Sequence, residues 1–93
     1  MAVTLSIPTA LRQYAANNAS ISLEANTVGN LLHGLIELHP DLGQHLFDEQ
    51  GKLRSFVNVY VGDEDIRYLD GVDTLLKDGE LVSIIPAIAG GRG

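Results

Sequence analysis

The C-terminal residues 87–93 combine the residue types in this chain that are most suited to chemistry. Glycine occupies three of the last four positions, around Arg92. Because glycine lacks a Cβ atom, such a segment is slim enough to thread a narrow channel in a partner protein and to present a carboxylate there, although ordering it costs much backbone entropy. A frayed terminus has a similar composition, so the glycines alone leave a plain flexible end as the alternative.

Other groups of reactive side chains predict no catalytic or metal centre. The chain has no cysteine, which excludes a thiolate nucleophile, a disulfide and a cysteine-ligated metal site. His33, His39 and His45 stand six residues apart, a spacing that turns helical side chains to different faces, so we expect surface histidines. Residues 63–65 are adjacent carboxylates without the spacing of a calcium loop, and we expect a solvated turn. Neither a P-loop nor a Gly-x-Ser-x-Gly elbow is present, so the sequence predicts no enzyme.

The charge balance bears on the kind of partner. Six basic residues stand against twelve acidic ones, a net charge of −6. Such a chain repels phosphate backbones, so no nucleic-acid partner is expected and a protein with a basic face is favoured. The first seven residues alternate in polarity and lack a basic n-region, which argues against a signal peptide and a membrane span. We therefore expect a cytoplasmic protein that is monomeric when free and has no membrane partner.

The period of the apolar residues predicts the elements of the first half of the chain. Apolar residues alternate with polar ones over residues 3–7 and 20–24, which predicts two strands of an antiparallel hairpin with a long loop. Over residues 28–36 they recur every three or four positions, the pattern of an amphipathic helix of about three turns. Thr27 is expected to cap the start of this helix, and Pro40 is expected to stop it.

The second half is predicted to return to strands. A short helical turn is expected within residues 41–50. Residues 56–61 are rich in β-branched and aromatic side chains, and the turn at 62–63 is expected to lead into a second strand at 66–69. The nearly continuous apolar run over residues 81–85 is typical of a central strand covered by the helix.

The resulting order is strand, strand, helix, three further strands and a tail. One helix against one sheet is an α+β layout, and it matches the ubiquitin-like β-grasp with a mixed sheet of about five strands covered by one main helix. In that fold the first and last strands lie side by side at the centre of the sheet. The sequence thus predicts one β-grasp domain over residues 1–87 and a flexible C-terminal tail over 88–93.

Three segments resemble the bacterial sulfur-carrier proteins of the MoaD/ThiS family. They are Phe-Val-Asn-Val-Tyr-Val at residues 56–61, Leu-Lys-Asp-Gly-Glu-Leu-Val at 76–82, and 84–91, which runs from Ile-Ile-Pro to Gly-Gly. The resemblance spans nearly the whole chain. Within the family it is nearest to the cysteine-pathway sulfur carriers, through residues 57–65, and the Pro to Gly-Gly ending is its most diagnostic part.

The resemblance implies a carrier rather than an enzyme. In this family an E1-like enzyme uses ATP and Mg to adenylate the carboxylate of the C-terminal glycine. That carboxylate becomes a thiocarboxylate, which donates sulfur to a downstream sulfur-accepting enzyme in the biosynthesis of an amino acid, a cofactor or a secondary metabolite. Carried over to this chain, the reacting carboxylate is that of Gly91, with Ala89 and Gly90 threading into the partner. The chain itself would bind no cofactor.

The chain departs from the family pattern after Gly91. Family members usually end at the second glycine, whereas Arg92 and Gly93 follow here. A subgroup of sulfur carriers is made as precursors whose short extension is removed by a zinc metallopeptidase of the JAMM type, which predicts cleavage between Gly91 and Arg92. An arginine side chain would also obstruct a channel of glycine width. Activation of Gly93 itself and a cloning remnant are the alternatives.

Other functions share the same tail. A ubiquitin-like modifier would pass the activated glycine to a lysine of another protein, a molybdopterin synthase small subunit would donate sulfur within one pathway, and an interaction-only β-grasp adaptor would leave the tail unchanged. Phe56, Tyr60 and Tyr68 are expected on a sheet face left open for partner docking, with ordinary packing as the alternative.

Overall fold

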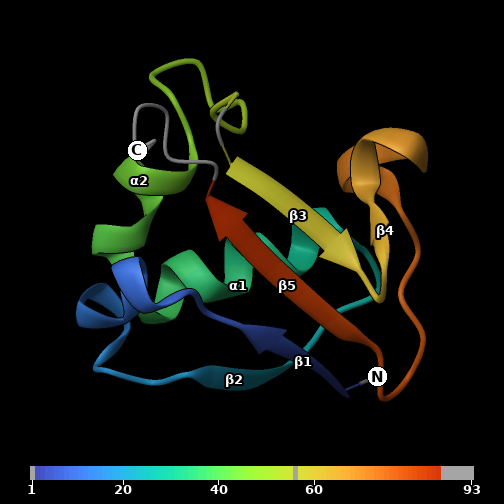
Figure 1. Ribbon diagram of the computed structural model, residues 1–93, viewed down its shortest axis with the longest axis horizontal. Helices are drawn as coiled ribbons and strands as arrows, with labels where there is room; N and C mark the ends of the chain where they lie inside the picture. Colours follow the sequence, from blue (N-terminus) through green and yellow to red (C-terminus); the bar gives the residue numbers. More distant parts are fainter. Residues whose placement is uncertain (1, 56, 87–93) are drawn as a thin grey trace.

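Over residues 2–55 and 57–86, which the computed structural model describes (for Pro86, the main chain only), the chain forms one five-stranded sheet with a helix across it (Figure 1). The strands are β1 (Ala2–Ser6), β2 (Ser20–Glu24), β3 (Val57–Val61), β4 (Glu64–Asp65) and β5 (Leu81–Pro86). The α-helices of this part are α1 (Val28–Leu38) and α2 (Gly43–Leu46). Within it, every helix is too short or too polar to cross a membrane.

The sheet is mixed, with the strand order β2-β1-β5-β3-β4. The first and last strands, β1 and β5, run parallel at its centre, and the other neighbouring strands are antiparallel. A parallel pair needs a long crossover connection, which here contains α1 and places it on one face. This arrangement confirms the predicted β-grasp fold.

The connection between β1 and β2 is more ordered than the predicted loop. The two strands pair in antiparallel register from Ala2↔Glu24 to Ser6↔Ser20, as expected. Between them the chain forms a 3₁₀ helix, η1 (Thr9–Ala15), which buries Leu11 and Ala15. Its end is marked by Ala16 and Asn17, with φ of 54° and 63°. The buried side chains explain the extra order, because they tie this connection to the core.

Helix α1 begins and ends as predicted. The Thr27 hydroxyl accepts a hydrogen bond from the Asn30 backbone N–H at 3.1 Å, which satisfies one of the free donors of the first turn. The helix ends at Leu38, two residues before Pro40. Its buried stripe consists of Val28, Leu31, Leu32 and Leu35. The predicted helical turn is present as a 3₁₀ helix, η2 (Pro40–Leu42), followed by α2, and it buries Leu42 and Leu46.

The strand predicted at residues 66–69 is wrong. The chain turns at Gly62, whose φ is 62°, into the two-residue strand β4, and then forms a 3₁₀ helix, η3 (Ile66–Tyr68). The cause lies in Asp65, whose carboxylate accepts a hydrogen bond from the Arg67 backbone N–H at 2.9 Å and caps this helix. A local side-chain hydrogen bond therefore replaces the expected ladder.

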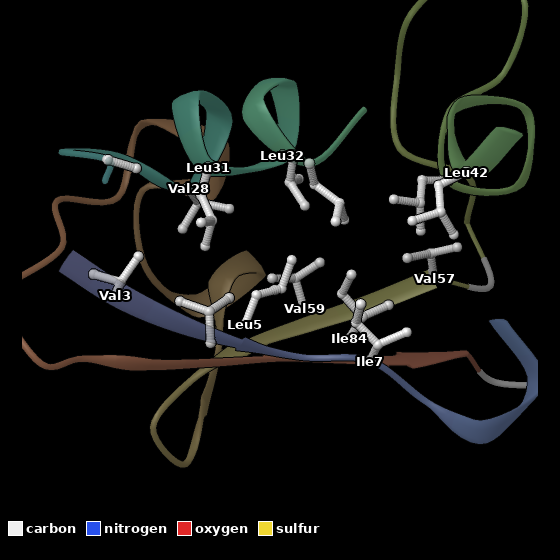
Figure 2. Packing of buried hydrophobic residues seen from close by; sticks show 14 of the residues in the cluster. Val3, Leu5, Ile7, Val28, Leu31, Leu32, Leu42, Val57, Val59 and Ile84 are labelled. Atoms are coloured by element: carbon white, nitrogen blue, oxygen red, sulfur yellow. The ribbon is translucent and has the colours of Figure 1, made fainter. Parts of the chain in front are cut away.

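The core fills the space between the helices and one face of the sheet, which we call the inner face (Figure 2). The four residues of the α1 stripe have no exposed surface. They pack over inner-face side chains that are each at most 6% exposed: Val3, Leu5, Val57, Val59, Val82 and Ile84. Burial of this apolar surface is the main stabilising contribution to the fold.

Candidate functional site

Strand β5 is the element that leads to the C-terminal residues. It is hydrogen-bonded on both sides, to β1 and to β3, and its last described pair is Val57↔Pro86. Val82 and Ile84 hold it in the core. A central strand of this kind belongs to the most stable part of a fold. Pro86, the last described residue before the tail, is therefore held at one end of the sheet.

The predicted residues of the tail lie outside the described part of the chain. They are Ala89, Gly90, Gly91 and Arg92, and the predicted boundary between domain and tail falls there as well. Adenylation at Gly91, threading by Ala89 and Gly90, and cleavage before Arg92 therefore stay predictions.

The second candidate surface is the outer face of the sheet, opposite α1. In Figure 1 the strands face the viewer and α1 lies behind them. Successive side chains of a strand point to opposite faces, so the residues that alternate with the buried ones lie on this outer face. They are Thr4 and Ser6 of β1, Leu81, Ser83 and Ile85 of β5, Asn58 and Tyr60 of β3, and Ser20, Ser22 and Glu24 of β2. Its β2–β1 half is hydroxyl-rich, and its β5–β3 half carries the larger apolar groups.

The run 81–85 lies in a central strand covered by the helix, as predicted, but two of its apolar side chains are exposed on the outer face. Leu81 and Ile85 are each 48% exposed. The helix covers β5 on the inner face only, so the alternate positions of the run remain open. Exposed apolar groups on a sheet face are typical of a surface that meets another protein.

The structure separates the three predicted docking residues. Tyr60 lies on the outer face, half-buried and opposite Ser83 of β5. Tyr68 lies in η3 rather than on a strand and is 86% exposed. Phe56 is outside the described residues. The docking role of all three stays a prediction.

A polar cluster at the β3–β4 edge of the outer face escaped the sequence analysis. Asp65 was expected in a solvated turn, but it is buried, with 7% of its surface exposed. Its Oδ2 accepts a hydrogen bond from Arg67 Nη2 at 2.8 Å, and its Oδ1 accepts one from Arg67 Nε at 3.2 Å. Arg67 Nη2 also donates to Asn58 Oδ1. The Asp-x-Arg spacing could have predicted the Asp65–Arg67 pair from the sequence. The contact with Asn58 could not be predicted, because it depends on how β3 and η3 lie in the fold.

This pairing shifts the titration of the carboxyl. The hydrogen bonds from the Arg67 guanidinium and from the Arg67 backbone N–H hold the pKa of Asp65 below its usual range, although burial opposes them. Asp65 therefore stays charged through the neutral range and keeps the guanidinium in place.

The histidines divide into two kinds. His33 is exposed, as predicted. His39 and His45 are half-buried, so the surface prediction holds for them only in part. The His45 ring stacks on Tyr14 with 4.2 Å between the ring centroids, and its Nε2 is buried. His45 of α2 thus contacts Tyr14 of η1, and only the fold brings these two segments together. Among the described residues, no group of three or more His, Asp or Glu is placed to hold a metal ion.

The comparison with known families gives a match over most of the chain. The sequence profile of the ThiS family matches residues 5–91, so the match begins in β1 and ends at Gly91. The match therefore includes the Gly-Gly pair and, apart from the first residues of β1, the whole described sheet.

Individual relatives agree with the family match. The sulfur carrier protein CysO of Mycobacterium tuberculosis is 42% identical over 93 residues, covering 98% of this chain and 100% of that protein. Small archaeal modifier protein 3 of Haloferax volcanii is 38% identical over 65 residues, 70% of each chain.

The fold comparison agrees with the sequences. A chain of the Amycolatopsis orientalis BexX/CysO complex superimposes with a TM-score of 0.87 and 39% identity, covering 96% of this chain and 99% of that one. The β-grasp core, the Gly-Gly pair and near full-length similarity to sulfur carriers agree with one another. The chain therefore belongs to the ThiS family and is a sulfur carrier rather than an enzyme.

Proposed function

We propose that this sulfur carrier works through the carboxylate of Gly91. The single observation that carries the assignment is the family match, which ends at this residue. The position of β5 supports it, because a central strand that ends at Pro86 leaves five residues to reach from the sheet to Gly91. Ala89 and Gly90 are the residues that thread into the partner.

The chemistry needs a partner enzyme. A carboxylate resists nucleophiles because of its charge, so one of its oxygens first attacks the α-phosphate of ATP, and pyrophosphate leaves. Hydrosulfide then attacks the carbonyl carbon of the acyl adenylate, and AMP leaves with the C–O bonding electrons, which yields the thiocarboxylate. An E1-like adenylating enzyme supplies the ATP and Mg for this step. The thiocarboxylate then donates its sulfur to a downstream sulfur-accepting enzyme.

The Gly91 carbonyl must first be released from its peptide bond with Arg92. An amide is neither adenylated nor attacked by hydrosulfide at a useful rate, so the bond is hydrolysed beforehand. A zinc metallopeptidase of the JAMM type suits this step, because metal-bound water is a strong nucleophile and extended glycines fit a tight cleft. Cleavage leaves Gly91 with a free carboxylate.

The outer face of the sheet is the surface on which the partner docks. Its exposed Leu81 and Ile85 lie on either side of Ser83, which pairs with Tyr60, and we call these apolar side chains the apolar centre of the face. Tyr68 of η3, which is 86% exposed, and Phe56 stay docking candidates from the sequence alone. The complex of the Amycolatopsis orientalis relative with BexX supports docking by a partner protein.

Three proteins test the proposal: the full-length chain, a version ending at Gly91, and the full-length chain treated with the candidate peptidase. Each is incubated with the adenylating enzyme of its own genome, ATP and a sulfide source, and its intact mass is measured. We expect exchange of one oxygen for sulfur in the second and third proteins only. The third should lose one Arg and one Gly, and a zinc chelator should prevent that loss.

Two results would contradict parts of this scheme. If the version ending at Gly91 gains no sulfur with any such enzyme, Gly91 is not the working group. If the full-length chain gains sulfur as readily as the truncated one, cleavage before Arg92 is unnecessary and Gly93 is the activated residue.

A protein modifier is the second candidate function, favoured by the similarity to a small archaeal modifier protein. The first step is the same, but the activated Gly91 would pass to a lysine amine rather than to sulfide. Branched tryptic peptides that carry the tail on lysines of cellular proteins would identify this function. A molybdopterin synthase small subunit would differ from other sulfur carriers in the enzyme to which its thiocarboxylate donates sulfur.

A further inference from the structure

Arg67 is held in a single orientation by acceptors from two residues, Asp65 and Asn58. Its Nε and Nη2 donate to the two carboxylate oxygens of Asp65, at 3.2 Å and 2.8 Å, along one edge of the guanidinium. Nη2 also donates to Asn58 Oδ1 on β3. Such two-point pairing fixes the plane of the guanidinium as well as its position.

The remaining donors of the guanidinium are those on Nη1. Of its five N–H donors, those on Nε and Nη2 are engaged, and the two on Nη1 have no acceptor among the described residues. The Arg67 side chain is 59% exposed, whereas that of Asp65 is only 8% exposed. With respect to residues 2–55 and 57–86, a cation that is fixed on its buried side thus keeps two donors for a partner.

The location of this cation links it to the outer face. Asn58, which receives its Nη2 bond, stands opposite Ile85 in the β3–β5 register, one pair away from Val57↔Pro86. Arg67 therefore lies at the rim of the apolar centre and near the place where β5 ends. A fixed donor at the rim of an apolar patch is the usual composition of a protein-binding surface.

We propose that Arg67 binds a carboxylate of the enzyme that docks on the outer face, through its free Nη1 donors. This inference rests on the proposed docking of an adenylating enzyme. It makes Arg67 a specificity-determining residue: an enzyme without an acidic group at this position would leave the donors unpaired. The side chain positions the carrier and does not touch the reacting atoms at Gly91.

A carboxylate fits this site better than a free phosphate. Each N–H of Nη1 can donate one hydrogen bond to a carboxylate oxygen of a partner, whereas the net charge of −6 repels a free multivalent anion. A carboxylate on a docking protein arrives together with burial of Leu81 and Ile85, which offsets that repulsion.

The test compares Arg67→Gln with Lys77→Gln, both in the version ending at Gly91. Each variant removes one positive charge from an exposed residue, but Lys77 precedes β5 at the end remote from Pro86. Binding to the adenylating enzyme is measured by calorimetry at several salt concentrations. We expect Arg67→Gln to weaken binding about tenfold and to reduce its salt dependence, and Lys77→Gln to change binding less than about twofold. Arg67→Lys, which keeps the charge but loses the fork, should fall between them.

A second measurement identifies the group that Arg67 binds. Acidic residues of the enzyme are changed one at a time to the matching amide, and each is combined with Arg67→Gln in a double-mutant cycle. We expect one acidic residue whose effect on binding disappears in the Arg67→Gln background. Thermal unfolding of each carrier variant keeps a loss of fold apart from a loss of contact.

Each outcome decides a different claim. Equal binding by wild type and a folded Arg67→Gln, or no coupling with any acidic residue, would overturn the assignment of Arg67. Saturable binding of inorganic phosphate at the Arg67 side chain, seen by NMR, would overturn the choice of a protein carboxylate. If wild type binds the enzyme but gains no sulfur, the proposed function fails while the result for Arg67 stands. If wild type does not bind, both fail.

Discussion

Ile84 and Ile85 are neighbours in β5 but lie on opposite faces of the sheet, with 3% and 48% of their surfaces exposed. The inner face, to which Ile84 belongs, packs against α1 and is apolar throughout. The outer face, to which Ile85 belongs, combines hydroxyls, two exposed apolar groups and the oriented Arg67. The same strands thus serve two purposes, because alternation lets the inner positions specify the fold while the outer positions remain free for a partner.

Truncation of the α1 side chains that pack on the inner face should give the largest loss of stability. Leu32 and Leu35 have no exposed surface, so truncation of either one removes many contacts and leaves a cavity. We expect Leu32→Ala or Leu35→Ala to lower the free energy of unfolding by about 2 to 5 kcal/mol, measured by denaturant titration. Unchanged midpoints would show that this stripe does not face the core.

The isoleucine pair tests the two faces within one strand. Ile84→Ala should cost about 2 to 4 kcal/mol, because its side chain is buried. Ile85→Ala should change stability by less than about 1 kcal/mol, since only its strand preference and partial packing are lost. The same Ile85→Ala variant should weaken binding to the partner enzyme. Equal stability losses at both positions would mean that a part of the chain covers the outer face.

A third prediction concerns the stability contributed by the Asp65 carboxylate at the edge of the outer face. Asp65→Asn keeps the shape but loses the charged hydrogen bonds to Arg67, so we expect a loss of about 1 kcal/mol at neutral pH. In wild type the pKa of this carboxyl is lowered on folding, so the unfolded chain binds a proton more readily. Its contribution is full above the ordinary Asp pKa and is lost as the pH falls through the lower folded value.

The pH dependence gives a direct check on that sign. Unfolding free energies of wild type and Asp65→Asn, measured from pH 7 down to about pH 3, should converge as the solution becomes more acidic. A constant difference across this range would show that the Asp65–Arg67 pair does not shift the titration.

Removal of residues 90–93 should have the smallest effect on stability. Every residue of the described core lies between Val3 and Ile84, so the deletion takes nothing from it. We expect a change in the unfolding free energy within about 0.5 kcal/mol, together with complete loss of sulfur loading. A clear drop in the melting temperature would indicate that these residues pack against the domain.

Much of the fold follows from local patterns. The strands at β1, β2 and β3 and the helix α1 were predicted because a period of two or of 3.6 residues requires only the sequence of the element itself. The Thr27 cap was predictable for the same reason. The strand at 66–69 was predicted wrongly, because a single hydrogen bond from the Arg67 N–H to Asp65 overrides a preference for extended backbone.

The candidate site divides in the same way. The Gly-Gly pair, the absence of cysteine and the family resemblance follow from residue type and order alone. That Leu81 and Ile85 stay open is a property of the folded sheet, because an apolar run does not reveal that one face alone is covered. The fold also places His45 on Tyr14 and brings Asn58 of β3 to Arg67 of η3. These contacts join separate elements, and their energies arise only when the sheet and its connections bring the side chains within hydrogen-bond or van der Waals distance.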